Sequence, residues 1–153
     1  MLHVSLSISL NYNSKGMRKV FADTLYWIAV TKPRDEWHDA SLAARKRLGE
    51  VILVTTDDVL VEFLAALRKG PVLREKAVQV VRAILGNPNV KVIPHSRKSF
   101  LEGLDLYALR QDKEYSLTDC ISMNVMKSES IQESLTNDDH FEQEGFRVLI
   151  EKP

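Results

Sequence analysis

Short apolar runs alternate along this chain with longer segments in which apolar residues recur at helical spacing. The apolar runs have the length of strands buried on both faces, and they lie at residues 19–22, 51–54, 90–93, 131–135 and 147–150. The segments of helical period predict helices at residues 24–31, 35–49, 55–69, 72–85, 97–111, 117–127 and 138–143. Strands that are separated by helices pair in parallel through right-handed crossovers. The pattern therefore predicts an α/β fold, a three-layer sandwich.

The start of the chain follows a different pattern. Residues 2–10 alternate strictly between apolar and polar side chains, which is the period of a half-buried strand. They lack the charged start and the continuous apolar run of a signal peptide. We interpret residues 1–16 as an N-terminal extension, either an extra edge strand or a disordered segment ahead of a natural start at Met17. Residues 17–153 then form one domain, as the length of the chain predicts.

Composition narrows the class of protein only slightly. Hydrophobic residues make up 44% of the chain and charged residues 27%, as in ordinary globular proteins. Basic and acidic residues balance at 21 each, so net charge neither favours nor excludes a nucleic-acid partner. A single cysteine excludes an internal disulfide and a multi-cysteine zinc site. With no apolar stretch long enough to cross a membrane, we expect a cytoplasmic protein with no membrane partner.

Acidic residues stand at four positions where packing alone does not explain a carboxylate: Asp23, Glu62, Asp119 and Asp138. Asp23 and Asp138 follow predicted strands, and the carboxyl ends of parallel strands share one edge of the sheet. Asp119 lies at a predicted helix start, where the helix dipole favours a negative charge. Glu62 lies about two turns into a helix between residues expected to be buried on both sides, where an unpaired carboxylate is costly.

Each acid also has a simpler explanation. Each of the three aspartates could be a helix N-cap, and Glu62 could face solvent. Together, however, four converging acids would repel one another and raise their pKa values unless a cation were bound. Mg²⁺ and Mn²⁺ prefer oxygen ligands. The set therefore predicts a divalent-metal site suited to hydrolysis of a phosphodiester.

Other polar and aromatic residues carry weaker signals. We expect His140 to be a surface residue, Cys120 to face the core, and Trp27 and Trp37 to pack rather than to stack on bases. Asp57 and Asp58 are typical first-turn acids of a capped helix. Candidate contacts to a phosphate backbone, each of which alone is better explained as part of a solvated helix face, are Arg68, Lys69, Arg74, Arg97, Lys98, Arg110 and Lys127.

Four segments that contain the acids resemble the PIN-domain family, and in particular the VapC-like prokaryotic ribonucleases. They are residues 21–24, 56–63, 116–120 and 135–141, and the likeness in order and spacing spans about residues 18–150. The resemblance implies a central parallel sheet of about five strands. It also implies an endoribonuclease that needs Mg²⁺ or Mn²⁺ and cuts RNA, the toxin of a toxin–antitoxin pair, with a small antitoxin as partner and a homodimeric state.

The resemblance also assigns roles to residues. Asp23, Glu62, Asp119 and Asp138 would be the catalytic, metal-binding quartet. We choose Asp138 over its neighbour Asp139 because it fits the family's Thr-x-Asp-x-x-Phe pattern. The polar residues that would orient the acids or the substrate are Thr24, Thr118, Thr136 and Asn137.

Three other functions compete with this hypothesis. A haloacid-dehalogenase-type phosphatase needs a second aspartate two residues after Asp23, where Leu25 stands. A response-regulator receiver domain needs an acidic pair near the end of the first strand and a lysine at the end of the last strand, and neither is evident. A PIN-fold module that binds RNA or protein without cutting it is the remaining alternative. The complete quartet argues against such a module, and Mg²⁺ binding would separate the two functions.

Overall fold

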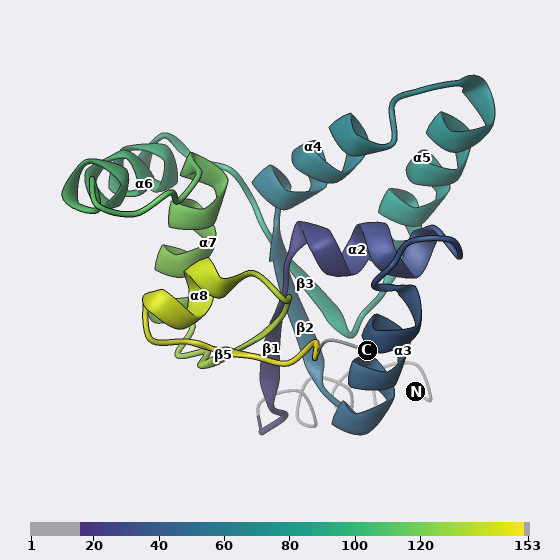
Figure 1. Cartoon of the computed structure of the whole chain (residues 1–153), viewed down its shortest axis with the longest axis horizontal. Coiled ribbons are helices and arrows are strands. Elements are labelled where there is room, and N and C mark those ends of the chain that lie inside the picture. Colours follow the sequence, from purple (N-terminus) through teal and green to yellow (C-terminus); the bar gives the residue numbers. More distant parts are fainter. Residues whose placement is uncertain (1–15, 152–153) are drawn as a thin grey trace, which may run out of the picture.

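Five parallel strands form one sheet in the order β3-β2-β1-β4-β5 (Figure 1). The computed structural model describes residues 16–151, so the strand predicted within residues 1–16 lies outside the described residues except for Gly16. The strands are β1 (Lys19–Ala22), β2 (Ile52–Thr56), β3 (Val90–Ile93), β4 (Glu133–Leu135) and β5 (Arg147–Val148). The helices are α2 (Thr24–Thr31), α3 (His38–Leu48), α4 (Asp57–Ala66), α5 (Pro71–Gly86), α6 (Arg97–Leu109), α7 (Leu117–Ser128) and α8 (Asp139–Gln143). The predicted α/β class is confirmed.

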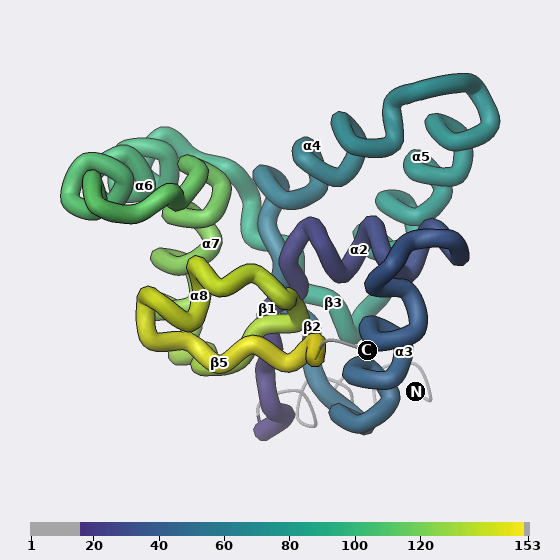
Figure 2. The backbone as a smooth tube through the Cα atoms, viewed as in Figure 1, coloured from purple at the N-terminus to yellow at the C-terminus, as the bar shows by residue number. Residues whose placement is uncertain are grey.

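Helices cover both faces of the sheet. Helices α2 to α5 lie on one face and α6 to α8 on the other (Figure 1). The backbone trace in Figure 2 shows α8 beside α7 on the second face, with the edge strand β5 next to α8, in agreement with the contacts of α8 with α7 and β5. The three-layer arrangement is the one expected for right-handed crossovers that first extend the sheet from β1 toward β3 and then return to β4.

The strand order reverses between β1 and β4, and ligands of open α/β sheets bind at such a reversal, beyond the carboxyl ends of the strands. Ala22 pairs with Leu135 in the sheet register. The next residue of each strand, Asp23 and Thr136, therefore lies at the same edge. The buried apolar strand β1 fixes this position, because Val20, Phe21 and Ala22 are completely buried.

Some element boundaries differ from the prediction, and side-chain hydrogen bonds explain two of the differences. The helix expected from residue 35 begins at His38, because Asp35 Oδ1 accepts a hydrogen bond from Trp37 N (2.8 Å) and holds a turn there. Strand β2 continues to Thr56, where Thr55 Oγ1 donates to the Ala22 carbonyl (2.9 Å). The last two strands are shorter than expected. Within residues 16–151, none of the helices combines the length and apolar character needed to cross a membrane.

Candidate metal centre

Five carboxylates line one cavity of about 310 Å³ at the carboxyl edge of the sheet: the four acids that the sequence singles out, and Asp35. Asp23 follows β1, Glu62 lies within α4, Asp119 lies in the first turn of α7, and Asp138 immediately precedes α8. The structure thus brings together the four acids that the sequence singles out. The remaining residues that line the cavity are Thr24, Leu25, Ile28 and Trp37.

Asp23 is the deeply buried member of the group, with 6% of its surface exposed. The pKa of its carboxyl group is raised to about 7, mainly by burial and in smaller part by the nearby charges of Asp119 and Glu62, against the lowering effect of hydrogen bonds. Thr136 Oγ1 donates a hydrogen bond to Asp23 Oδ2 (3.0 Å) and accepts one from Asp138 N (3.1 Å). Thr136 therefore links two of the acids at the junction of β1 and β4.

Two of the three aspartates that line the cavity and follow the predicted pattern, Asp119 and Asp138, also take part in helix capping. Asp138 is the N-cap of α8 and accepts a hydrogen bond from His140 N (2.9 Å). Asp119 is not an N-cap. It is the third residue of α7 and forms a capping box with Ser116, whose backbone N–H donates to Asp119 Oδ2 (3.0 Å). Asp23 occupies the N-cap position of α2, but its side chain makes no capping hydrogen bond. Capping alone therefore leaves the Asp23 side chain unexplained.

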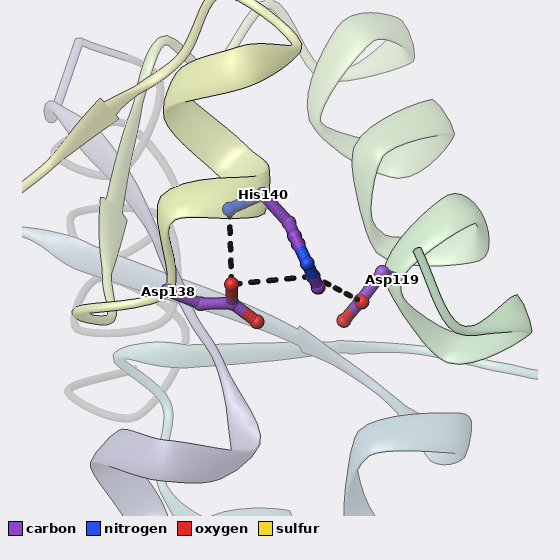
Figure 3. A group of neighbouring side chains, drawn as sticks. All are labelled: Asp119, Asp138 and His140. Carbon is purple, nitrogen blue, oxygen red and sulfur yellow. Dashed lines mark hydrogen bonds and ion pairs between the residues drawn. The ribbon is translucent and has the colours of Figure 1, made fainter. Parts of the chain in front are cut away.

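His140 lies between two of the carboxylates, so the expectation that it is a surface residue is wrong (Figure 3). Its Nδ1 is 3.4 Å from Asp119 Oδ2 and 3.3 Å from Asp138 Oδ1. The sequence contains a signal for this position of His140. The second residue after an N-cap aspartate lies in the first helical turn, close to the cap, and His140 is the second residue after Asp138. Asp139, the alternative to Asp138, is exposed.

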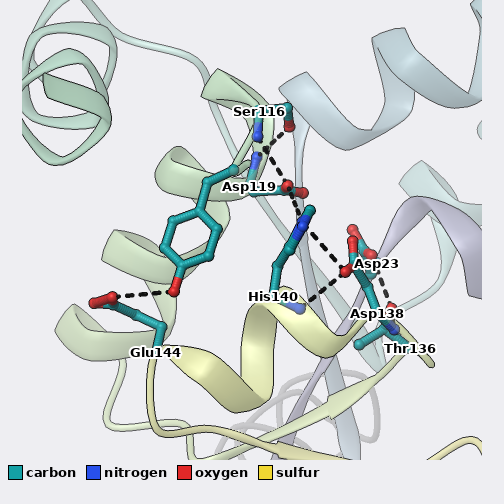
Figure 4. Close-up of polar contacts among 8 residues, drawn as sticks. Asp23, Ser116, Asp119, Thr136, Asp138, His140 and Glu144 are labelled. Atoms are coloured by element: carbon teal, nitrogen blue, oxygen red, sulfur yellow. Dashed lines mark hydrogen bonds and ion pairs between the residues drawn. The ribbon is translucent and has the colours of Figure 1, made fainter. Parts of the chain in front are cut away.

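Ion pairs hold the end of α8 through Glu144, whose side chain Figure 4 shows together with His140. Glu144, just after α8, accepts hydrogen bonds from Arg110 Nε (2.8 Å) and Lys127 Nζ (3.2 Å). The hydrogen bond from Arg110 is the main reason that the pKa of Glu144 is lowered. Tyr115 lies between these ion pairs and the site, with its ring 5.4 Å from that of His140. Arg110 and Lys127 are thus engaged in ion pairs, which weakens their candidacy as phosphate contacts.

The supporting residues differ in what they touch. Thr24 is buried at the cavity wall, and its Oγ1 has no hydrogen-bond partner within the described part of the chain. Asn137 Nδ2 donates to the Ile150 carbonyl (2.6 Å) and so fixes the loop rather than the acids. Thr118 is half-buried in the first turn of α7.

Glu62 is half-buried, and its surroundings differ from the expectation. The following residue, Phe63, is buried, but the preceding residue, Val61, is 67% exposed. Glu62 therefore lies at the boundary between the buried and exposed faces of α4. Its carboxylate lines the cavity without being enclosed on both sides by buried residues.

The donor set fits a hard divalent cation. One ligand atom from each of Asp119, Asp138 and His140 lies within 4.8 Å of the others. Burial is the main cause of the raised pKa of Asp23, and the nearby charges of Asp119 and Glu62 add to it. The unpartnered hydroxyl of Thr24 adds a further oxygen to the cavity lining. Carboxylate and hydroxyl oxygens suit Mg²⁺ and Mn²⁺. The cavity can therefore hold such an ion, while its identity stays a prediction.

Cys120 and Trp27 have the packing roles that the sequence predicts, and Trp37 has its predicted role only in part. Cys120 is completely buried, and burial raises the pKa of its thiol to about 11. Trp27 is buried, and its indole N–H donates to Thr55 Oγ1 (3.3 Å). Trp37 packs against the core but is only half-buried, and it also lines the acidic cavity.

Comparison with solved structures identifies the fold. VapC20 of Mycobacterium tuberculosis, described as a toxin that cleaves the sarcin–ricin loop, matches with a TM-score of 0.74 and 23% identity over 83% of this chain and 95% of that one. DNA-bound VapBC of Salmonella typhimurium matches with a TM-score of 0.62 and 18% identity over 86% and 97% of the two chains. FitAcB of Neisseria gonorrhoeae matches with a TM-score of 0.61 and 14% identity over 85% and 96%.

Sequence comparison adds no assignment, because no protein-family model and no curated protein matches the chain. The structural matches cover most of both chains, and they agree with the five-stranded parallel sheet and its helical layers. The likeness to VapC-like PIN-domain proteins that the sequence motifs indicate is thus confirmed in the fold, and this chain has the fold of the VapC toxins.

Proposed function

We propose that the protein is a metal-dependent endoribonuclease that hydrolyses RNA phosphodiester bonds. The observation that supports this most directly is the cavity itself. The four acids that the sequence singles out come from separate segments and line one cavity at the strand-order reversal, and Asp23 among them is buried with a pKa raised to about 7. Neighbouring carboxylates repel one another unless a cation neutralises them. A divalent cation bound here would also attract a phosphate group.

The residues have distinct roles in this proposal. Asp23, Glu62, Asp119 and Asp138 hold Mg²⁺ or Mn²⁺, and one of them also orients the attacking water. A divalent cation supplies an acidified water and neutralises charge on the scissile phosphate. Thr136 fixes the orientation of Asp23 through the hydrogen bond between their side chains. His140 is a positioning residue that holds Asp119 and Asp138 at a fixed separation.

The partners follow from the same comparison. VapC20 is described as a toxin that cleaves the sarcin–ricin loop, and VapBC of Salmonella typhimurium was solved bound to DNA. By analogy with these proteins, we propose that this chain is the cytoplasmic toxin of a toxin–antitoxin pair. Its partners would then be an RNA substrate, a small antitoxin and a second copy of itself.

Cleavage of RNA with and without a chelator tests the proposal. The purified protein should cut total cellular RNA in Mg²⁺ or Mn²⁺ and should stop cutting when the chelator is added. Asp119→Asn should lower the cleavage rate by about 100-fold or more, as loss of an essential acid does. The fold should be retained, because an asparagine oxygen can still accept the hydrogen bond from Ser116 N.

Asp105→Asn is the matched control, because Asp105 is an exposed residue of α6. This variant should cut RNA as the wild type does. Undiminished, chelator-sensitive cleavage by pure Asp119→Asn protein would refute the assignment of the site. If the folded wild-type protein neither binds Mg²⁺ nor cuts RNA, the non-catalytic binding module becomes the better explanation.

A further inference from the structure

We propose that Trp37 is a stacking platform for a base of the single-stranded RNA that enters the acidic cavity. This inference rests on the proposed function and adds to it a residue that positions the substrate. The inference is based on the apolar residues that line the cavity. Besides the carboxylates, three apolar side chains line the same cavity: Leu25, Ile28 and Trp37.

The apolar part of the cavity is accessible rather than sealed in the core. Leu25 and Ile28 lie three residues apart on α2 and so share one helix face. Together with Trp37, they pack against the core while remaining half-buried. The lining of the cavity therefore combines carboxylates, suited to a cation, with apolar side chains that include an indole ring. A nucleotide likewise combines a phosphate, which binds a cation, with a base, which stacks on an aromatic ring.

The backbone at Trp37 is held by three contacts. Asp35 Oδ1 accepts a hydrogen bond from Trp37 N (2.8 Å), and the Trp37 carbonyl accepts one from Ser41 N (2.9 Å), the first bond of α3. The ring of His38 anchors the same turn to α2, with Nδ1 2.6 Å from the Ala29 carbonyl. A ring carried on a fixed turn loses little freedom when a base stacks on it, which favours binding.

The other tryptophan shows what a packing role looks like in this fold. Trp27 is 6% exposed, and its indole N–H is bound to Thr55 Oγ1. Trp37 differs from it by its exposure and by its place in the cavity lining. An aromatic ring in this position accepts any base, because every base has a π-face, so the contact would support binding without selecting a sequence.

Binding of a short single-stranded RNA of mixed sequence tests the inference. Affinity would be measured by fluorescence anisotropy in Ca²⁺, with a gel confirming that the strand stays whole. Trp37→Ala should weaken binding by about 5- to 150-fold, the range for loss of one stacked base. Trp37→Phe should keep much of the affinity, since a ring remains. A strand of the same length with abasic sites is the matched ligand, and on it Trp37→Ala should have little effect.

Intrinsic fluorescence gives an independent readout. Adding RNA should quench the emission of the wild type and of Trp27→Phe, which retains Trp37, but not that of Trp37→Phe. Thermal melting of each variant shows that it is folded. Equal losses on the intact and abasic strands, or no loss on either, would overturn the inference, as would quenching that persists in Trp37→Phe.

The two proposals fail in different ways. If the wild type cuts RNA in Mg²⁺ while Trp37→Ala binds and cuts equally well, the stacking role is wrong and the nuclease function stands. If the wild type neither binds nor cuts RNA, both are wrong. A surface that instead binds a protein partner would show Trp37→Ala weakening that complex without any effect on RNA, and this result also overturns the inference.

Discussion

Asp23 is a carboxyl group in a place that disfavours its ionised form. Burial raises its folded-state pKa from 3.8 to about 7. Between these two values, the folded protein retains the proton and the unfolded chain releases it. The stability of the metal-free protein therefore falls as pH rises through this window, by on the order of 4 kcal/mol in total, and stays low above about pH 7.

Asp23→Asn removes the buried ionisable group, and the asparagine oxygen can still accept the hydrogen bond from Thr136. In a chelating buffer the variant should be more stable than the wild type at about pH 8, and the difference should shrink to nothing near pH 4. Urea unfolding across this range measures the effect. Asp139→Asn, a change at an exposed residue, should show no such pH-dependent gain. A variant less stable than the wild type at about pH 8 would show that the buried charge is not destabilising.

The sequence indicates the acids well and their surroundings poorly. Asp23 and Asp138 can be found because each follows a strand, and strand ends are readable from short apolar runs. The sequence predicts a surface position for His140, because its true position depends on a tertiary contact, the packing of His140 beside Tyr115. The place of Trp37 in the cavity depends on the turn formed by Asp35, which the helical spacing did not reveal.

At the level of elements, the predicted bounds agree with the structure where the sequence carries a clear start or stop signal. β1, α2 and β3 have the predicted bounds, since Asp23 and Pro94 mark strand ends clearly. The helix α4 ends at Ala66, three residues before the predicted position, because no strong stop signal precedes Gly70. The close packing of α6 against α7 could not be predicted, since it depends on the absence of a side chain at Gly103.

Gly103 allows α6 to approach α7, and a methyl group there should disrupt the contact. A Cβ atom at this position would lie 2.6 Å from Ile121 Cγ1, well inside van der Waals contact. Gly103→Ala should therefore destabilise the protein by about 1–3 kcal/mol, as overpacking does, despite the better helix propensity of alanine. The loss can be measured by urea unfolding.

Gly86→Ala is the matched change for this test. Gly86 is the last residue of α5, and a Cβ there would meet nothing within 4 Å. This variant should be neutral or stabilised by up to about 1 kcal/mol. If Gly103→Ala were as stable as Gly86→Ala, the helices could separate at little cost, and the fit between Gly103 and Ile121 would not matter to the fold.

At the scale of the whole molecule, the cavity joins the two helical layers. Asp23 and Glu62 come from segments that lead into or form the first layer, whereas Asp119 and Asp138 belong to the second (Figure 1). A cation bound by all four would link elements that otherwise meet mainly through the sheet. Its binding energy would then stabilise the complete fold, because the unfolded chain holds the acids far apart.

Mn²⁺ should therefore raise the melting temperature of the wild type. At a free concentration about 100 times its dissociation constant, the gain should be about 2.7 kcal/mol, or roughly 5–10 °C for a chain of this size. Asp138→Asn should lose most of the gain, since it removes a charged ligand while asparagine remains a good N-cap for α8. Asp139→Asn should keep the gain, because that residue is exposed.

Calorimetric melting with and without Mn²⁺ decides whether Asp138 or Asp139 is the ligand. Loss of the gain in Asp139→Asn rather than in Asp138→Asn would move the ligand by one residue, and an equal gain in all three proteins would place the ion elsewhere.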